Sequence, residues 1–370
     1  MAIIVVTGAD GFVGKSLCLR ARELGHTVLS IVRTTNDTEW QAALSSADIV
    51  FHLAGVNRPK TEDEFAIGNT DLTRSLCEGL RRTGRTVPIV LSSSIQASLD
   101  NAYGRSKKAA EDIVLAYGRD TGASVHIFRL PNVFGKWCRP NYNSAVATFC
   151  HNIARGLPVQ INDPSAVLRL VYVDDVVERF LAIVSEPPSY AEFDQIAPEY
   201  QTTVGELVEI LNGFPAMRES LVAPRVGAGL VRALYSTYVS YLPTEQFVYQ
   251  VPRHNDPRGT FVEMLKTEDS GQFSYFTAHP GVTRGGHYHH SKTEKFLVIK
   301  GKARFGFRNV ATGEMHEILT QGGEARIVET VPGWTHDITN IGEDEMIVML
   351  WANEIFDRAR PDTIAMKVNP

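Results

Sequence analysis

Short apolar runs alternate with amphipathic stretches through the first half of the chain. Ile3–Thr7 is a β-branched run with the continuous hydrophobicity of a parallel strand that is covered on both faces. A helical stretch from Lys15 to Leu24 follows it. Further strands are predicted at Thr27–Val32, Ile49–Leu53 and Val87–Leu91. Because the second and third strands are joined by a short segment, we expect this α/β sheet to lack one strand of the fullest version of such a domain.

The pattern changes in the second half. The stretch from Tyr200 to Tyr241 is helical by its periodicity, and Pro243 ends the pattern. Beyond this proline, FLVIKGKARFGF has strand composition with a glycine turn inside it. Because 370 residues are too many for one ordinary core, two domains are expected. We predict an α/β domain over residues 1–243 and a small all-β barrel over residues 244–370.

Composition restricts the class of protein. With 44% hydrophobic and 21% charged residues, the chain matches soluble globular proteins. The net charge is -5 and the basic residues form no cluster, so we expect no nucleic-acid partner. No apolar run approaches the roughly 18 residues of a membrane span. The start MAIIVVTG lacks the basic region of a signal peptide, and the cysteines have no paired spacing. We therefore expect a cytoplasmic protein with free thiols and no membrane partner.

The turn after the first strand is rich in glycine. Its sequence is Gly-Ala-Asp-Gly-Phe-Val-Gly, from Gly8 to Gly14. Glycines permit a tight turn and a close approach of the backbone to a phosphate, and the next helix begins with free N–H groups. The position between a strand and a helix favours this interpretation over the alternative, a plain turn. We predict that a dinucleotide binds here, with contacts from Gly8, Asp10, Gly11, Phe12, Val13 and Gly14.

Arg33 follows the second predicted strand. NAD-specific enzymes of this architecture usually have an acidic residue there, which binds the ribose hydroxyls. An arginine can pair with a 2′-phosphate instead, so we predict NADPH as the cofactor. The alternative is a solvated arginine that contacts nothing.

Three serines, Ser92–Ser94, end the strand at Val87–Leu91, and Tyr103 and Lys107 follow at the start of a helical run. A spacing of four places Tyr103 and Lys107 on one helix face. The lysine charge favours the phenolate and so lowers the pKa of the phenol. The tyrosine can then exchange a proton with a carbonyl while a nicotinamide transfers hydride, and a serine hydroxyl can bind the same oxygen. A chance Tyr-x-x-x-Lys spacing is the alternative.

Histidines gather in the second half of the chain. His287 and His289 are two residues apart, which places them on one face of a strand, and Glu294 and His336 follow. Three imidazoles and one carboxylate suit a borderline divalent ion such as Zn²⁺. The interior of a small β-barrel is a usual place for a pocket, so we predict a metal site made by these four residues. The alternative is a histidine-rich loop without a metal.

The first half resembles the extended short-chain dehydrogenase/reductases, which have a Rossmann fold. The runs HLAGVN, RLPNVFG and VYVDDV support the resemblance. It implies pyrophosphate contacts from the glycine loop, adenosine contacts from Leu53, Ala54 and Gly55, and nicotinamide contacts from Pro131, Asn132 and Val133. It also implies Ser94, Tyr103 and Lys107 as the catalytic set, with Ser93 as the alternative serine. Many members act on nucleotide-activated sugars. Asn132 and Arg169 are candidates for substrate binding, although Arg169 is offset by one position from the family's arginine.

The second half resembles the cupin family. The spacing G-x5-H-x-H-x4-E-x6-G matches its first motif, and P-G-x2-H-x3-N its second, except that Pro332 and Gly333 are adjacent here. The run from Asp256 to Glu263 resembles the start of the dTDP-sugar 3,5-epimerases, which are cupins. That likeness implies that Arg258 binds substrate phosphate. A turn and a strand without such a role is the alternative.

Together the two halves resemble the CapF-type bifunctional enzymes of capsular polysaccharide synthesis. HLAGVNRP, the short spacing from LSSSIQ to YGRSK, and GGHYHHSKTEKFLVIKG carry the resemblance. It implies that the cupin epimerises C3 of a 4-keto UDP-2-acetamido-2,6-dideoxy-hexose and that the other domain reduces the C4 ketone with NADPH. The product would be UDP-2-acetamido-2,6-dideoxy-L-talose, on the UDP-N-acetyl-L-fucosamine route to capsule or O-antigen. A homodimer is implied as well.

Two other classes of function stay open. One is an NAD(P)-dependent nucleotide-sugar 4-epimerase or 4-reductase whose cupin is a structural, dimerising module. The other is a binding or regulatory protein, which the intact Tyr103 and Lys107 disfavour. The sequence does not decide whether the metal is catalytic or structural. Four residues are open as the epimerase base, namely His254, Tyr288, Lys292 and Lys295.

Overall fold

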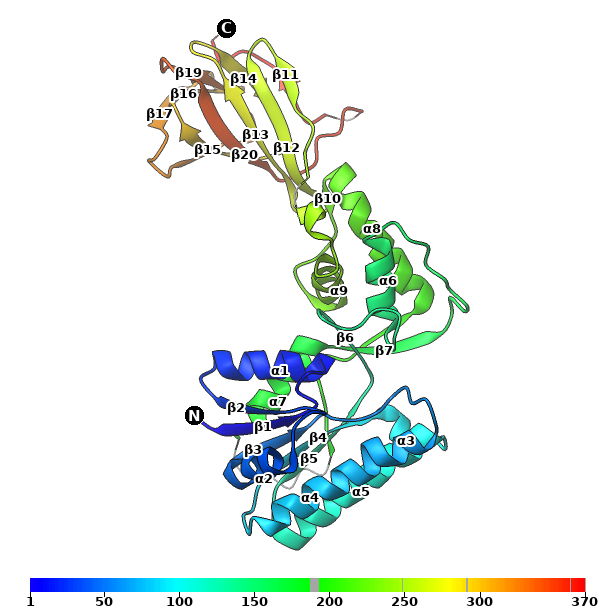
Figure 1. Cartoon of the computed structure of the whole chain (residues 1–370). Coiled ribbons are helices and arrows are strands. Elements are labelled where there is room, and N and C mark those ends of the chain that lie inside the picture. The colour runs from blue at the N-terminus through cyan, green and yellow to red at the C-terminus, as the bar shows by residue number, and fades with distance from the viewer. Residues whose placement is uncertain (187–192, 248, 291, 360, 370) are drawn as a thin grey trace. The chain divides into compact units, whose positions relative to one another are not determined.

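The computed structural model describes residues 1–186, 193–247, 249–290, 292–359 and 361–369. The chain divides into two units, which are described separately (Figure 1). The first unit comprises Met1–Leu211 and Arg232–Leu242, and the second comprises Asn212–Val231 and Pro243–Pro370. One division therefore falls beside the linker expected at Pro243. The sequence pattern did not predict that residues 212–231 group with the second unit.

A parallel sheet forms the centre of the first unit, with its strands in the order β2-β1-β3-β4-β5-β8. The bounds are β1 Ile3–Thr7, β2 Thr27–Ile31, β3 Ile49–His52, β4 Ile89–Ser94, β5 Val125–Leu130 and β8 Phe193–Asp194. The apolar runs supply its buried centre, since Val5, Val50 and Ile127 are fully buried. In the described part of the chain no strand lies beyond β2. The predicted Rossmann-type α/β fold is confirmed.

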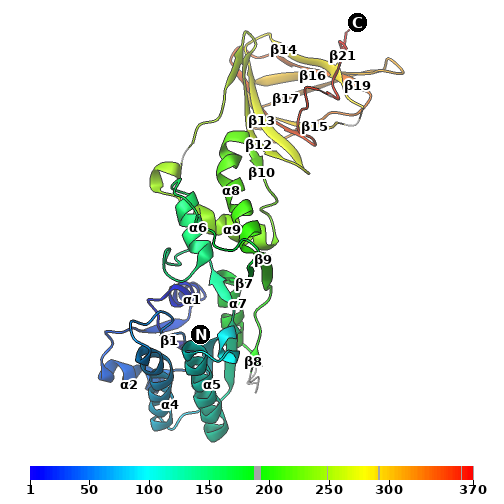
Figure 2. The same cartoon turned by 90° about the vertical axis from the view of Figure 1, so that its right-hand side faces the viewer.

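Helices cover both faces of this sheet (Figures 1 and 2). One face carries α1 Phe12–Glu23 and α7 Val173–Ile183, and the other carries α2 Asp37–Ser46, α4 Leu72–Arg82 and α5 Ala102–Thr121. On the first face the Phe180 ring of α7 lies 5.8 Å from that of Phe51 and 4.9 Å from that of Phe128. On the second face Leu44, Leu76 and Tyr117 belong to one buried apolar cluster. Both faces of the strands are therefore sealed from water, as their uninterrupted hydrophobicity predicts.

The prediction of one helical stretch from Tyr200 to Tyr241 was wrong at two places. Strand β9 (Tyr200–Thr203) pairs antiparallel with β7 (Val167–Tyr172), which also pairs with β6 (Asn132–Phe134). A reciprocal cap then starts α8 (Val204–Ser220), because Glu206 accepts from the Thr203 N–H and donates its own N–H to the Thr203 hydroxyl. Strand β10 (Val222–Ala223) interrupts the pattern again before α9 (Gly229–Val239), because it pairs with a distant strand, β12. Helix α6 (Ala145–Ile153) completes the first unit's larger elements.

The second unit is built from two sheets of mainly antiparallel strands (Figure 1). One sheet has the order β10-β12-β13-β20-β15-β18, with β11 beside β12, and the other has the order β17-β16-β19-β14-β21. The bounds of its strands are β11 His254–Asp256, β12 Gly259–Thr267, β13 Gly271–Ala278, β14 Thr283–Tyr288, β15 Glu294–Lys300, β16 Lys302–Asn309, β17 Met315–Gln321, β18 Ile327–Glu329, β19 Trp334–Asn340, β20 Met346–Ala352 and β21 Ile364–Ala365. Apolar residues of both sheets, such as Phe276, Phe305 and Ile338, form one core. This architecture confirms the predicted all-β, cupin-type fold.

Two features of the whole chain bear on its surroundings. Within the described ranges, no helix combines the length and the apolar character that a membrane crossing requires. The thiols of Cys18, Cys77, Cys138 and Cys150 are all free.

Candidate functional site

A cavity of about 560 Å³ lies in the first unit, where β1, β3, β4 and β5 end. In open parallel sheets the carboxyl ends of the strands are the usual position for a ligand. The cavity is lined by most of the residues that the sequence indicated, namely Gly8, Asp10, Gly11, Phe12, Val13, Gly14, Leu53, Gly55, Ser94, Tyr103, Lys107, Pro131, Asn132 and Val133. The structure therefore brings the glycine loop and the Tyr-x-x-x-Lys segment to one cavity.

The glycine loop has no room for side chains at its two ends. Gly8 has φ +68°, and a Cβ there would lie 2.8 Å from Ala54 Cα. A Cβ on Gly14 would lie 2.2 Å from the Gly8 carbonyl oxygen. The first turn of α1 thus packs directly on the loop, with its N–H groups free of side-chain cover. This backbone geometry fits the diphosphate of a dinucleotide, which needs close contact with main-chain N–H groups.

Two residues predicted to bind the cofactor do not line this cavity. Ala54 lies behind Gly8, and its N–H donates to the Thr7 hydroxyl. Arg33 lies two residues beyond the end of β2 and is exposed. The role of Arg33 in cofactor choice therefore stays a prediction.

Tyr103 and Lys107 lie in the first turns of α5, whose start is fixed by Asn101. The Asn101 side chain accepts from the Gly104 N–H at 2.8 Å and caps the helix. A Cβ on Gly104 would lie 2.3 Å from the Gln96 carbonyl oxygen, so only glycine lets the helix pack this closely on the segment after β4. This close packing brings the Tyr103 hydroxyl near Ser94 at the strand end, where Ser94 acts to lower the pKa of the phenol.

The prediction that Lys107 lowers the pKa of Tyr103 was wrong. Burial raises the pKa of the Tyr103 phenol, and the hydrogen bond with Ser94 offsets only part of that rise. Lys107 points elsewhere, since its ammonium donates to the Ser92 carbonyl oxygen at 2.9 Å. Burial lowers the pKa of Lys107 to about 8, against the opposite effect of Glu111. Tyr103 is therefore a protonated acid at neutral pH, beside a lysine that titrates near pH 8.

The two candidate serines differ in what they contact. Ser93 is buried, and its hydroxyl donates to Glu111 Oε1 at 2.5 Å. Arg129 binds the same carboxylate through two N–H bonds of 2.9 and 2.6 Å. Both serines border the cavity with Tyr103, but Ser94 is only partly buried and does not bind Glu111. The geometry therefore favours Ser94 as the serine that meets a ligand.

Sequence patterns missed several residues of this region. Asn69, in a π-helical turn (Ala66–Asp71), accepts from the Val56 N–H at 2.8 Å and donates to the Val56 carbonyl at 3.0 Å and to Ser106 at 2.9 Å, so it ties the strand β3 side of the cavity to α5. Tyr142 and Arg139 also line the cavity, with the guanidinium carbon of Arg139 5.3 Å from the centre of the Tyr142 ring. The sequence offered one indication of these two residues, because an aromatic and a basic residue follow the RLPNVFG run closely.

The predicted substrate residue Arg169 does not line the cavity. Its guanidinium, on β7, is paired with both carboxylate oxygens of Glu199 and is about half exposed. Asn132, by contrast, lines the cavity, and its side-chain amide donates to the Arg169 carbonyl oxygen at 3.2 Å.

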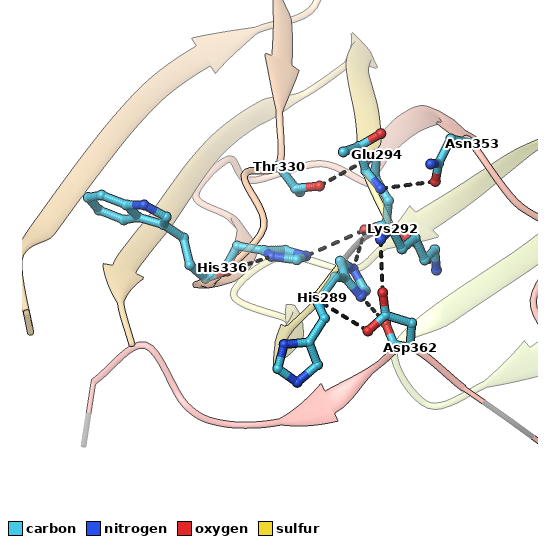
Figure 3. A network of polar contacts seen from close by, with 10 residues as sticks. His289, Lys292, Glu294, Thr330, His336, Asn353 and Asp362 are labelled. Atoms are coloured by element: carbon cyan, nitrogen blue, oxygen red, sulfur yellow. Dashed lines mark hydrogen bonds and ion pairs between the residues drawn. The ribbon is translucent and has the colours of Figure 1, made fainter. Parts of the chain in front are cut away.

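The four candidate metal ligands converge in the second unit (Figure 3). One ligand atom from each of His287, His289, Glu294 and His336 lies within 4.8 Å of the others. His287 on β14 is paired across the sheet with His336 on β19, and Glu294 begins β15 of the opposite sheet. His289 lies just after β14, where its carbonyl oxygen accepts from the Gly333 N–H at 2.8 Å. The site thus lies inside the barrel, between its two sheets.

The chemistry of this cluster fits a divalent cation. His289, Glu294 and His336 are at most 5% exposed. The buried Nε2 of His336 lies 3.4 Å from Glu294 Oε2, yet it has no hydrogen-bond partner among the described residues. Burial would raise the pKa of Glu294, but the imidazoles of His289 and His336 and the ammonium of Lys292 together lower it well below its usual value. Burial also lowers the pKa of His287 to about 4. A carboxylate facing neutral imidazoles is the state that binds a metal.

The candidate epimerase bases have different surroundings. Lys295 pairs with Glu329 on the adjacent strand and is partly exposed, and His254 is exposed on β11. Lys292 is buried, and its ammonium lies 3.0 Å from Glu294 Oε1. The Tyr288 ring packs edge-on against His290. Geometry therefore places Lys292 next to the ligand cluster and leaves Lys295 in a surface ion pair.

Arg258, the predicted phosphate-binding residue of the second unit, already forms an ion pair with Asp256. Its guanidinium donates to Asp256 Oδ2 at 2.5 and 3.1 Å, and these hydrogen bonds lower the pKa of Asp256 to about 2. More than half of the Arg258 side chain is exposed, so it has room for a second anionic partner.

Comparison with known proteins agrees with both units. Residues 4–195 match the NAD dependent epimerase/dehydratase family, and residues 254–364 match the polysaccharide biosynthesis C-terminal domain. The crystal structure of the capsular polysaccharide assembling protein CapF from Staphylococcus aureus is similar with a TM-score of 0.91 and 42% identity, over 98% of this chain and 99% of that chain. The chain belongs to the CapF family.

Two other relatives differ in how much of this chain they resemble. A UDP-2-acetamido-2,6-beta-L-arabino-hexul-4-ose reductase from Pseudomonas aeruginosa is 61% identical over 366 residues, or 99% of this CapF-family chain and 98% of that protein. The UDP-N-acetylglucosamine 4-epimerase from Bacillus cereus is 19% identical with a TM-score of 0.56, over 68% of this chain and 99% of that chain. That second likeness concerns the fold alone, whereas the first covers both units.

Proposed function

We propose that this chain is a bifunctional enzyme that acts on a UDP-activated 2-acetamido-2,6-dideoxy sugar with a ketone at C4. The second unit epimerises C3, and the first unit reduces the C4 ketone with NADPH to give UDP-2-acetamido-2,6-dideoxy-L-talose for capsule or O-antigen synthesis. Full-length similarity to a protein named UDP-2-acetamido-2,6-beta-L-arabino-hexul-4-ose reductase supports the substrate class. The observation that carries the reductase role is the shared cavity of the glycine loop, Ser94, Tyr103 and Lys107.

In the first unit each of these residues has a distinct task. A bound nicotinamide would supply the hydride, and Pro131, Asn132 and Val133 line the cavity where it would lie. The protonated Tyr103 gives its proton to the ketone oxygen as that oxygen gains charge. The Ser94 hydroxyl donates a hydrogen bond to the same oxygen and aligns it with the phenol. The Lys107 ammonium donates to the Ser92 carbonyl oxygen in the free site, and it is proposed to turn toward the phenolate that remains and stabilise it.

In the second unit His287, His289, Glu294 and His336 would hold the ion. A divalent ion there would supply positive charge beside the C4 ketone oxygen, which makes the C3 proton more acidic. The barrel's own residues then have to orient the sugar and exchange that proton. Among the candidate bases Lys292 contacts a ligand candidate, Glu294, and it could take the C3 proton only after its ammonium has lost one.

The order of the two steps follows from chemistry. The C3 proton is acidic only while C4 is a ketone, so epimerisation precedes reduction.

Arg258 is proposed to bind the substrate phosphate in the second unit. In the first unit Arg139 is a better candidate than Arg169, because Arg139 lines the cavity and Arg169 is held by Glu199. An Arg139→Ala variant should raise KM for the UDP-sugar and leave KM for NADPH unchanged.

We further propose that the protein works as a homodimer in the cytoplasm. Strands at open sheet edges favour a partner chain, and four free thiols suit a reducing compartment. A monomeric mass by light scattering at micromolar concentration would argue against the dimer.

The function itself is tested by incubating the purified protein with the 4-keto UDP-sugar and NADPH. Stoichiometric NADPH oxidation with formation of UDP-2-acetamido-2,6-dideoxy-L-talose is expected. No NADPH oxidation with the 4-keto sugar, together with interconversion of the two C4 epimers of the 4-hydroxy UDP-sugar by a tightly kept NAD, would favour a 4-epimerase with a structural cupin.

A further inference from the structure

The C-terminal segment of the chain runs along the strand that carries the first metal-ligand candidate. Strand β21 (Ile364–Ala365) pairs antiparallel with β14, and Ala365 is the register partner of His287. The Met366 N–H extends the pairing by donating to the Gly286 carbonyl at 2.9 Å. The segment is therefore part of the wall of the ligand cluster, although it lies more than 70 residues further along the chain.

Asp362 is hydrogen bonded to His289, His290 and Lys292, the described residues at the start of the loop that leads to Glu294 (Figure 3). Its carboxylate accepts from the His290 N–H at 2.9 Å and from the Lys292 N–H at 2.8 Å. Its main-chain carbonyl oxygen accepts from Nδ1 of His289. One residue thus holds both the backbone of the loop and the ring of one ligand.

The bond from His289 Nδ1 fixes the tautomer of that imidazole. A carbonyl oxygen can only accept, so the proton of the neutral ring must be on Nδ1. The lone pair is then on Nε2, which lies 3.2 Å from Glu294 Oε2 inside the cluster. Hydrogen bonds of this kind orient metal-binding histidines and raise their basicity. The bond therefore presents the correct nitrogen to an ion.

The same residue also orders the carboxylate ligand. Holding the Lys292 N–H fixes the place from which the Lys292 ammonium reaches Glu294 Oε1 at 3.0 Å. With Oε1 occupied, Oε2 faces both imidazoles, at 3.2 Å from His289 Nε2 and 3.4 Å from His336 Nε2. Two of the four ligand candidates therefore depend on Asp362 for their orientation.

We propose that Asp362 is a positioning residue of the metal centre, which sets the tautomer of His289 and, through Lys292, the orientation of Glu294. The proposal rests on the metal binding proposed for the second unit. It predicts that the C-terminal segment is required for tight metal binding and not merely for the stability of the barrel.

The test uses the full-length protein with Asp362→Ala and Asp362→Asn. Zn²⁺ affinity is measured by competition with a chromophoric chelator, and melting temperatures are measured with and without Zn²⁺. Asp362→Ala keeps the main-chain carbonyl that binds His289 but removes the carboxylate that anchors this carbonyl to the loop. The carbonyl is then no longer held against Nδ1, so Zn²⁺ binding should weaken by about 10- to 100-fold, the usual effect of disturbing such a partner. The melting-temperature gain that Zn²⁺ gives should shrink accordingly. Asp362→Asn keeps one acceptor oxygen for the loop and should fall between Asp362→Ala and the parent protein.

Arg308→Ala is the matched control, because Arg308 holds the end of the same segment through the carbonyls of Lys367 and Val368. It should lower the melting temperature of the metal-free and metal-bound forms alike and leave Zn²⁺ affinity unchanged. The absorption spectrum of the Co²⁺-substituted protein adds a readout of ligand geometry, which should change in Asp362→Ala and not in Arg308→Ala.

Two results would overturn the proposal, and they differ in meaning. If Asp362→Ala lowers both melting temperatures equally while its Zn²⁺ affinity and Co²⁺ spectrum match those of the parent, Asp362 has a structural role only. If the parent protein itself binds no Zn²⁺ or Co²⁺, the metal function proposed for the second unit fails together with this inference.

Discussion

The Ser93 hydroxyl donates a hydrogen bond of 2.5 Å to the buried carboxylate of Glu111. Because Arg129 binds the same carboxylate, Ser93 is held in the interior of the first unit. Both serines border the cavity, but the Ser94 hydroxyl takes no part in this ion pair and lies beside Tyr103. Alternation along a strand thus gives two adjacent serines opposite tasks, one structural and one available to a substrate.

Replacement of each serine by alanine should separate these tasks. Ser94→Ala removes a hydrogen bond to the ketone oxygen, so kcat for reduction should fall about 100-fold or more, with KM for NADPH unchanged. Ser93→Ala leaves Glu111 with one donor fewer, so the free energy of unfolding should fall by about 1–3 kcal/mol while kcat stays within a few-fold. Steady-state kinetics and urea unfolding measure both. A larger loss of kcat in Ser93→Ala than in Ser94→Ala would reverse the assignment.

The pH dependence of the reduction should report Lys107. Burial lowers its pKa to about 8, so the ammonium is present below that pH and is lost as the pH rises through it. Tyr103 stays protonated over the same range, because burial raises its pKa. The value of kcat/KM for the ketone should therefore be level below pH 8 and then decline, by about tenfold per pH unit well above the pKa. Lys107→Arg keeps its charge, so any residual activity should lack this decline. A parent profile that is flat to pH 10 would contradict the prediction.

Cofactor choice should depend on Arg33. It is exposed beyond β2, where a guanidinium can pair with the 2′-phosphate of NADPH. Arg33→Asp should weaken NADPH binding and improve NADH binding, as measured by fluorescence titration. Lys15 is a suitable control position, because it lines the cavity at the glycine loop and does not follow β2. Lys15→Ala should affect the two cofactors equally. Equal affinity of the parent protein for NADPH and NADH would rule out this role.

Removal of the metal should destabilise the second unit. The double variant His289→Ala, His336→Ala takes two buried ligand candidates from the cluster and should lose the bound ion. A ligand at 100 times its dissociation constant stabilises the folded state by about 2.7 kcal/mol, so a chelator should lower the melting temperature of the parent. It should have no further effect on the double variant. Elemental analysis that finds the same metal content in both proteins would exclude these ligands.

The sequence contains enough local information for the architecture and for much of both candidate sites. The glycine loop, the Tyr-x-x-x-Lys spacing and His287-x-His289 are short-range patterns, since each depends on how a single turn, helix or strand directs neighbouring side chains. The choice between Ser93 and Ser94 was beyond such patterns, because Glu111 and Arg129 decide it from two other elements. The raised pKa of Tyr103 was missed for a related reason, since burial is a tertiary property.

Long-range pairings explain the other misses. Strand β10 forms only because β12 lies beside it, and Asp362 reaches His289 across 73 residues of sequence. Asn69 joins two distant backbones with no motif of its own. No local sequence motif marks these residues, because their roles depend on partners that are distant in sequence and adjacent only in the folded chain.

The central claim is that the two units perform separate chemical steps, and deuterium exchange tests it most directly. The 4-keto UDP-sugar is incubated in D2O with each full-length variant, and mass spectrometry measures deuterium at C3. Tyr103→Phe removes the acid of the first unit, so it should lower NADPH oxidation by at least about 100-fold and leave deuterium uptake near the parent level. The double variant His289→Ala, His336→Ala should abolish deuterium uptake and still reduce a ketone that is supplied already epimerised. Loss of deuterium uptake in Tyr103→Phe would contradict the account, because one site would then perform both steps.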